Sequence, residues 1–383
     1  MNDLGAGGIP IARILGIEVR IHLSWVLILA IIAASVSSQL TATQPSWGEA
    51  LRWSVSGAVA VLFLLSVLAH ELAHAVLARR LGMGGGSVTL LFFGGAAIHG
   101  VQPARARDDV IVAAAGPIAS GIVAVVFLGA FVAGASVATA VGDAVAQVAI
   151  VLAALNLLLA LLNLLPVYPL DGGRILRAAI WRATGSETRA TRAAAMVSRL
   201  MGWLLIAGGV IVILGGDPLD GTMLAICGWF LSGMARSVER RLALEELLRG
   251  LRVENVMERG LPSVAPQLTL DTFAAQYLAS GEGTSLPVMR GEALMGLIGL
   301  SQLRRVRRAA WPRMRAADVM VSPPALPTLH PDDELWGALE RLRGTGLDGL
   351  PVLRGQELLG VLTRRGLVSA IKSRSQPPVR VAP

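Results

Sequence analysis

The sequence predicts a polytopic α-helical membrane protein with about six spans and a small membrane-associated β-hairpin or sheet, followed by an α/β module. Two observations carry this prediction. Of the 383 residues, 54% are hydrophobic and only 16% are charged, whereas about a quarter of an ordinary soluble domain is charged. The apolar residues also concentrate before residue 235, and charged residues become frequent after it. We therefore expect a membrane domain over residues 1–250, a soluble domain over 251–372 and a disordered tail over 373–383.

Six apolar segments come close to the ~20 residues that a helix needs to cross a bilayer. They cover residues 23–40, 51–77, 110–134, 140–165, 193–214 and 219–235. Residues 17–23 alternate apolar and polar side chains, which predicts a short strand before the first segment. Residues 87–93 are rich in β-forming side chains and too short to span. They predict a hairpin whose edge could pair with an extended peptide, and a glycine-rich reentrant loop is the alternative.

The distribution of arginine predicts how the spans are oriented. The net charge of +8 comes almost entirely from arginine, since Lys372 is the only lysine. The arginines gather in alternate loops, as the positive-inside bias of membrane proteins requires. This predicts a multi-pass protein of the cell (inner) membrane with both termini in the cytoplasm. A cleaved signal peptide would break the alternation, and a nucleic-acid partner is not expected because no basic face carries interleaved aromatic residues.

A metal-binding pattern lies inside the second apolar segment, where the sequence reads His-Glu-Leu-Ala-His. His70 and His74 are four residues apart, so on a helix they lie on one face and can reach a single ion. Glu71 lies between them and can reach a metal-bound water without being a ligand. A chance match is the alternative, but ionisable groups at bilayer depth are costly and are seldom kept without a function.

Asp171 is the candidate for the third ligand that a tetrahedral catalytic zinc requires. It lies at the end of the fourth apolar segment, in the sequence NLLPVYPLDGG of residues 163–173. In the predicted topology this end and the HExxH motif approach the same cytoplasmic face. The prolines and glycines around Asp171 are expected to break the helix and turn the carboxylate inward. The alternative is a loop aspartate that caps the next helix.

The pairing of HExxH with a later Asn-x-x-Pro-x-x-Pro-x-Asp-Gly motif resembles the site-2 protease family of intramembrane zinc metalloproteases. It is most similar to the branch with six spans and a C-terminal pair of CBS domains. The resemblance implies one catalytic Zn²⁺ held by His70, His74 and Asp171, with Glu71 as the catalytic base and Asn163 holding the substrate or the developing oxyanion. It also implies an endopeptidase in the lipid bilayer that cleaves a single-span, membrane-anchored regulatory protein. The alternative is a non-catalytic transporter or scaffold gated by CBS domains, which would not need Glu71.

The C-terminal part of the chain repeats itself. The heptapeptide SLPVMRG, which begins at Ser285, recurs as GLPVLRG from Gly349, and each copy is followed by a second apolar run. Such self-similarity predicts two α/β units of the same kind. They resemble a tandem CBS pair, which the predicted topology places in the cytoplasm together with the mouth of the active site.

CBS pairs often bind adenine nucleotides, and the resemblance places a Ser or Thr and then an Asp, three residues apart, after the last strand of each unit. This chain has Gly299 and Gln302 at these positions in the first unit, and Thr363 and Gly366 in the second. The absence of both aspartates argues against an adenine nucleotide. A homodimer contact through the CBS domains or a role in substrate recognition is supported about as well as nucleotide sensing.

Overall fold

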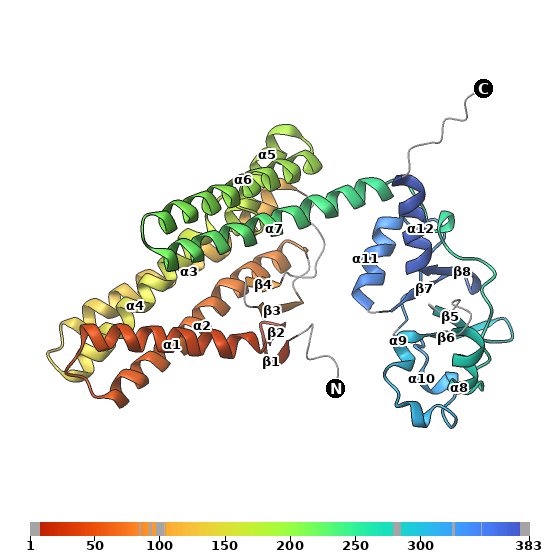
Figure 1. Cartoon of the computed structure of the whole chain (residues 1–383), viewed down its shortest axis with the longest axis horizontal. Helices are drawn as coiled ribbons and strands as arrows, with labels where there is room; N and C mark the ends of the chain where they lie inside the picture. Colours follow the sequence, from red (N-terminus) through yellow and green to blue (C-terminus); the bar gives the residue numbers. More distant parts are fainter. Residues whose placement is uncertain are drawn as a thin grey trace. The chain divides into compact units, whose positions relative to one another are not determined.

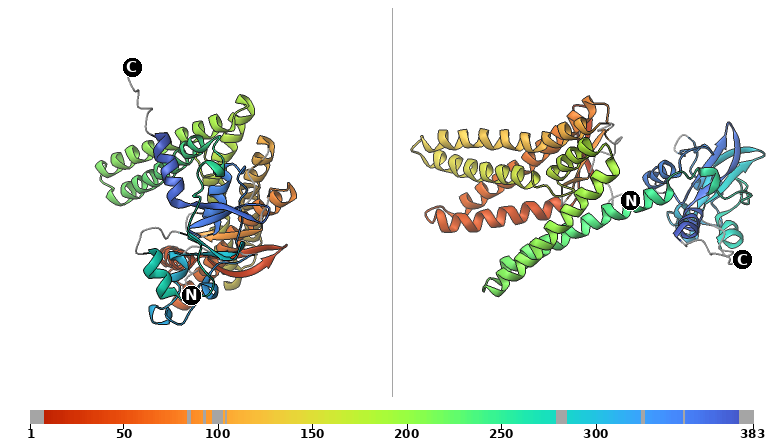
Figure 2. Two further views of the ribbon diagram at one scale, coloured as in Figure 1. Left: turned by 90° about the vertical axis from the view of Figure 1, so that its right-hand side faces the viewer. Right: turned by 90° about the horizontal axis from the view of Figure 1, so that it is seen from above.

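The computed structural model describes residues 8–83, 86–91, 94–96, 103, 105–278, 285–323, 326–345 and 347–375. The chain divides into two compact units, Met1–Glu239 and Arg240–Pro383, and the boundary falls inside one long helix, α7 (Pro218–Leu248). The first unit consists of long helices with a small sheet at one end of two of them (Figures 1 and 2). The second unit contains short strands and short helices.

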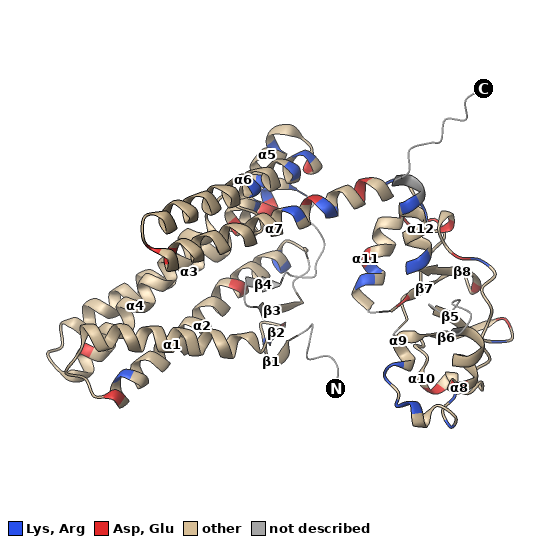
Figure 3. Ribbon diagram, in the orientation of Figure 1, with Lys and Arg blue, Asp and Glu red and all other residues tan. Residues whose placement is uncertain are grey.

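Within the described part of the first unit, five helices are long and apolar enough to cross a membrane. They are α1 (Ser24–Thr43), α2 (Glu49–Arg80), α3 (Ala106–Ala135), α4 (Ala140–Asn163) and α6 (Glu187–Leu214). Large apolar side chains on their outer faces, such as Val125 and Ile211, are exposed, as expected for residues that face lipid rather than water. Charged residues gather toward the helix ends (Figure 3). The predicted sixth segment lies in α7, which is not among these five helices, so the count of six spans stays a prediction.

The helices of the first unit pack mainly against their neighbours in sequence. Helix α3 packs along α4 and also contacts α2, and α1 packs on α2. The short helix α5 (Asp171–Thr184) lies between α4 and α6 in sequence and contacts both α3 and α6. Helices α6 and α7 approach each other through glycines, since an added Cβ on Gly209 would lie 2.5 Å from the carbonyl oxygen of Gly221. Small residues at such contacts allow close packing between helices in lipid.

The small sheet of the first unit has the strand order β1-β2-β3-β4, with β1 (Ile9–Ile14), β2 (Ile17–Ile21), β3 (Ser87–Leu91) and β4 (Gly94–Ala96). Strand β2 pairs in parallel with β3, and the other two pairs are antiparallel. The strand predicted over residues 17–23 and the hairpin predicted over 87–93 are confirmed, although residues 92–93 lie outside the described part of the chain. Buried Val19 and Leu90 pack with Trp25 and Leu68, which attaches the sheet to α1 and α2.

The second unit confirms the sequence repeat. Strands β5 (Ser285–Arg290) and β6 (Ala293–Gly299) form one antiparallel hairpin, and β7 (Gly349–Arg354) and β8 (Glu357–Thr363) form another. The two hairpins have the same register, with Leu286 opposite Ile298 in the first and Leu350 opposite Leu362 in the second. Both also carry an irregularity at the corresponding position.

Short helices complete each repeat around a buried apolar core. The α-helices are α8 (Leu270–Phe273), α9 (Leu300–Leu303), α10 (Ala316–Val319), α11 (Leu335–Thr345) and α12 (Arg364–Ser375), and further single turns are η1 (Val253–Asn255), η2 (Ala274–Leu278) and η3 (Arg308–Ala310). Helix α12 extends three residues into the tail predicted to be disordered, and residues 376–383 lie outside the described residues.

Candidate metal centre

Helix α2 brings the two histidines of the HExxH motif together. His70 and His74 are one helical turn apart and almost completely buried, with exposed fractions of 3% and 5%. Their Nε2 atoms lie 3.2 Å from each other. Glu71, between them in sequence, is half-buried. The helix therefore presents two nitrogen atoms at one point, as the motif predicts.

Asp171 completes the cluster from a different part of the chain. Helix α4 ends at Asn163, and after a turn the helix α5 begins at Asp171. The Oδ2 atom of Asp171 lies 3.3 Å from Nε2 of His70 and 3.1 Å from Nε2 of His74. The alternative of a helix-capping aspartate is wrong, because Leu170 occupies the N-cap position and Asp171 is already the first residue of the helix.

The glycines after Asp171 have a different role from the one predicted. Gly172 and Gly173 do not break a helix but form the first turn of α5. An added Cβ on Gly172 would collide with the carbonyl oxygens of Leu164 and Leu165. The glycines therefore allow the preceding turn to fold tightly against the start of α5, which holds Asp171 beside α2.

Helix α3 fixes the orientation of both imidazole rings. The Nδ1 atom of His74 lies 2.7 Å from the carbonyl oxygen of Val112, which can only accept a hydrogen bond. The proton of this ring is therefore on Nδ1, and Nε2 is left with a free lone pair. The Nδ1 atom of His70 bonds the hydroxyl of Ser120 at 2.9 Å. A hydrogen bond from the distal ring nitrogen to a carbonyl or other acceptor is the usual support of a metal-binding histidine.

The geometry of the cluster fits a zinc ion. His70, His74 and Asp171 could hold a metal ion together, and their facing atoms are 3.1, 3.2 and 3.3 Å apart. A tetrahedral zinc with bonds of 2.0–2.1 Å has ligand atoms about 3.3–3.4 Å apart. Asp171 adds one carboxylate oxygen to the two imidazole nitrogens, and two histidines with one acidic residue are a common ligand set of catalytic zinc sites.

The remaining predicted site residue is Asn163, whose side chain forms its hydrogen bond within its own helix. It is the last residue of α4, it is half-buried, and its side-chain amide donates a hydrogen bond of 3.0 Å to the carbonyl oxygen of Leu159 in the same helix. Its predicted contact with a substrate stays a prediction. In the sequence, the small residues Gly116 and Ser120 of the third apolar segment indicate only close packing of that helix, and nothing indicates the carbonyl of Val112.

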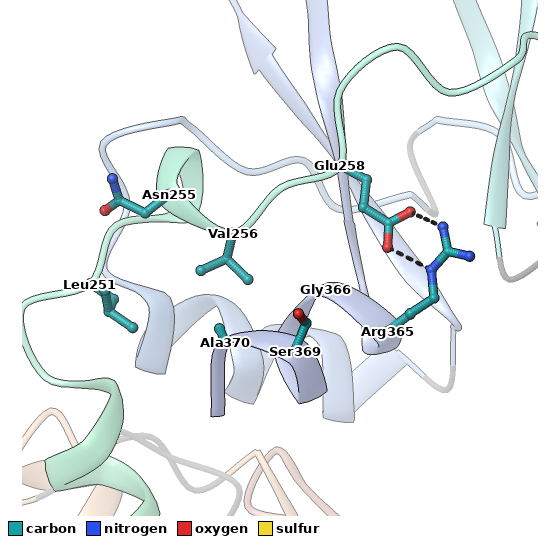
Figure 4. A pocket seen from close by; sticks show the side chains of 8 residues that line it. All are labelled: Leu251, Asn255, Val256, Glu258, Arg365, Gly366, Ser369 and Ala370. Carbon is teal, nitrogen blue, oxygen red and sulfur yellow. Dashed lines mark hydrogen bonds and ion pairs between the residues drawn. The ribbon is translucent and has the colours of Figure 1, made fainter. Parts of the chain in front are cut away.

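A cleft of about 670 Å³ lies in the second unit. Its lining comes from residues 251–258 and from the first half of α12 (Figure 4). Glu258 accepts hydrogen bonds from Arg365 at 3.0 and 3.1 Å and from the hydroxyl of Thr363 at 2.6 Å. An added Cβ on Gly366 would lie 2.7 Å from the carbonyl oxygen of Val256. The position where the resemblance places an Asp therefore has no room for a side chain.

Comparison with known proteins agrees with these features. The model of peptidase family M50 matches residues 58–208, and the CBS domain model matches residues 316–373, which is the second of the two repeats. Rip3 of Mycobacterium tuberculosis, named as a zinc metalloprotease, is 35% identical over 93% of this chain and 90% of its own length. Zinc metalloprotease MJ0392 of Methanocaldococcus jannaschii is 23% identical over 95% of this chain and 96% of its own.

Among solved structures, the site-2 protease from Methanocaldococcus jannaschii is 24% identical, with a TM-score of 0.39, over 58% of this chain and 94% of that one. The family follows from the similarity in sequence, which extends over nearly the whole chain. Membership in this family favours the enzyme over the non-catalytic transporter or scaffold. The chain belongs to the M50 peptidases, the site-2 protease family of membrane zinc metalloproteases, and carries a C-terminal CBS domain.

Proposed function

We propose that this chain is an intramembrane endopeptidase in which His70, His74 and Asp171 hold one zinc ion and Glu71 is the catalytic base. The observation that carries the proposal is the set of three buried ligand atoms, 3.1 to 3.3 Å apart, on two helices of a membrane protein. The fourth tetrahedral position is then open to water or substrate, which is the arrangement of a catalytic rather than a structural zinc site.

The chemistry of the proposal divides between the metal and the protein. Zinc, when bound, lowers the pKa of a coordinated water and polarises a peptide carbonyl. Glu71 accepts a proton from the attacking water and returns it to the nitrogen of the leaving amine. Val112 and Ser120 keep the two imidazole rings in place during this exchange. Asn163, at the end of α4, is proposed to hold the substrate backbone near the reacting carbonyl.

The proposed substrate is a membrane-anchored regulatory protein with a single span. Its helix must unwind before a carbonyl can be attacked, and freed backbone groups are costly in lipid unless they find partners. The small sheet of the first unit offers strands that could pair with the unwound segment by β-augmentation. The positive-inside bias supports a cytoplasmic mouth for the site. The CBS pair is proposed to recognise substrate or to form a homodimer, because both aspartate positions of the nucleotide-binding pattern are lost and an added Cβ at Gly366 would lie 2.7 Å from the carbonyl oxygen of Val256.

The proposal is tested by co-expressing candidate single-span proteins with the wild type and with Glu71→Gln. We expect the variant to retain zinc and to lose cleavage, because it keeps all three ligands and removes only the base. Glu49→Gln is the matched control, since it makes the same change at the exposed start of the same helix. Cleavage that persists in Glu71→Gln with zinc bound would rule out this role of Glu71.

A further inference from the structure

A fully buried acid lies on α3, one turn before Val112. Asp109 has an exposed fraction of 0% and accepts hydrogen bonds from two arginines of α5. Its Oδ1 atom lies 2.9 Å from Nη2 of Arg174, and its Oδ2 atom lies 2.6 Å from Nη2 of Arg177. Arg177 also contacts Glu187 of α6 at 3.2 Å. Each carboxylate oxygen of Asp109 therefore has its own arginine, and α3, α5 and α6 are joined at one point.

The position of these arginines connects them to the metal centre. Asp171, Arg174 and Arg177 are three residues apart along α5, so successive members lie close to one another on neighbouring faces of this short helix. A small rotation or shift of α5 would carry the carboxylate of Asp171 away from the histidines. The ion pairs of Asp109 oppose both movements, because each arginine is held at a fixed point on α3.

The same face of α3 also contacts the two histidine ligands, which lie on α2. Asp109, Val112, Gly116 and Ser120 are separated by three, four and four residues, which is the spacing of one helical stripe. Val112 and Ser120 orient the two imidazole rings. Gly116 is so close that an added Cβ would lie 2.5 Å from Nε2 of His70. One side of α3 thus contacts every element that supplies a ligand atom.

We infer that Asp109 is a positioning residue for the metal centre: through Arg174 and Arg177 it holds the start of α5 so that Asp171 stays within bonding distance of the ion. A contact that served packing alone would not need a buried carboxylate with two cationic partners, since burying such charges costs free energy unless all are paired. The inference rests on the zinc ligands proposed above.

The test compares Asp109→Asn with Asp108→Asn in the full-length protein in detergent. Asp108→Asn removes the same charge from the same turn of α3 and leaves the ion pairs of Asp109 in place. The zinc dissociation constant is measured by competition with a chromogenic chelator. We expect Asp109→Asn to weaken zinc binding by about tenfold, the low end of the loss found for groups that hydrogen-bond a metal ligand directly, because Asp109 acts through the two arginines. Asp108→Asn should leave zinc binding unchanged.

A second variant covers the case in which Asp109→Asn does not fold. Arg174→Gln removes one of the two ion pairs and leaves Arg177 in place, and the side chain of Arg174 is already 25% exposed. We expect a smaller loss of zinc affinity, and the combined effect with Asp109→Asn should be less than additive because both changes remove the same contact. Wild-type zinc affinity in the folded Asp109→Asn and Arg174→Gln proteins would overturn the inference.

Zinc binding also separates this inference from the proposed function. If Asp171→Asn leaves zinc binding intact, the proposed ligand set fails, whatever Asp109 does. If zinc binding depends on both Asp171 and Asp109 but Glu71→Gln still cleaves, the proposed catalytic role fails and the positioning role of Asp109 stands.

Discussion

The two units each contain a carboxylate held by arginine, and the two pairs differ in their exposure to water. Asp109 in the membrane unit is completely buried, and its partner Arg177 is only 11% exposed. Glu258 in the second unit lies at the edge of a cleft, and its partner Arg365 is 54% exposed. A buried charge that loses its partner is strongly destabilising, whereas an exposed ion pair contributes little. The two ion pairs have similar distances, but we expect the loss of the buried pair to lower the free energy of unfolding much more than the loss of the exposed pair.

The two units also each contain a glycine with no room for a side chain, and these two glycines differ in what their missing side chain makes room for. Gly116 of α3 faces the Nε2 atoms of His70 and His74, where the absent side chain leaves room for an ion. Gly366 of α12 lies against the carbonyl oxygen of Val256, where the absent side chain lets two backbone segments close together. One glycine leaves space where an ion could lie, and the other lets two backbone segments approach each other.

The largest effect is expected for Gly116→Ala. The added methyl group would lie 2.5 Å from Nε2 of His70 and closer to Nε2 of His74, which is close to the Zn–N bond length of about 2.0–2.1 Å. The methyl group and the ion would compete for one position. We expect zinc content, measured by atomic absorption, to fall from one ion per chain to almost none, with loss of cleavage.

The control for this prediction is Gly121→Ala in the same helix. An added Cβ on Gly121 meets no atom within 4 Å, so this variant should keep its zinc and its activity. Full zinc occupancy in Gly116→Ala would show that the ion does not lie beside this glycine.

A smaller effect is expected for the stability of the membrane unit in Asp109→Asn. The substitution leaves Arg174 and Arg177 without their buried counter-ion, and breaking such a pair typically costs about 3–5 kcal/mol. We expect the low end of this range, because Arg174 is partly exposed and Arg177 keeps its contact with Glu187. Unfolding in mixed micelles, compared with Asp108→Asn, measures the difference. Equal stability of the two variants would show that the buried ion pairs of Asp109 contribute little to the stability of the membrane unit.

The sequence predicted the parts of this centre that depend on local pattern. The histidines and Glu71 lie on one helix, where spacing alone predicts their proximity. Asp171 was predicted from the topology and its surrounding prolines and glycines. Asp109 was not predicted, because its partners are 65 and 68 residues away and no periodicity connects them. The carbonyl of Val112 could not be predicted either, because a backbone acceptor leaves no mark in the sequence.

The fold, too, could be predicted only where a local sequence pattern identifies the element. Strand β2 was predicted from its alternating side chains, and the repeated strands of the second unit were predicted from their matching heptapeptides. Strand β1 was missed because its sequence, IPIARI, contains Pro10, and proline argues against a strand unless the strand lies at the edge of a sheet. Only the pairing of β1 with β2 shows that it occupies such an edge.

A moderate effect is expected for Gly366→Asp, which introduces the residue type that the resemblance to nucleotide-binding CBS units places here. The new Cβ would lie 2.7 Å from the carbonyl oxygen of Val256, and overpacking of this kind costs about 1–3 kcal/mol. Hydrogen exchange should therefore become faster in peptides that cover β8 and α12. Gly337→Asp, at an exposed glycine of α11 with no atom near its added Cβ, is the control and should exchange like the wild type.

The smallest effect is expected for Glu258→Gln, and it should depend on pH. Burial raises the pKa of Glu258, but hydrogen bonds from Arg365 and Thr363 outweigh it and the net shift is downward. A lowered pKa in the folded state contributes stability above the ordinary glutamate pKa of about 4.3, and this contribution is lost as the pH falls through the lowered value. Because Arg365 is exposed, we expect Glu258→Gln to cost no more than about 1 kcal/mol at neutral pH. The difference from wild type should disappear in acid, as followed by hydrogen exchange of β8.

The control is Glu357→Gln, an exposed change at the start of β8, which should show no such pH dependence. If the effect of Glu258→Gln persists in acid, lost packing rather than the lost ion pair is responsible.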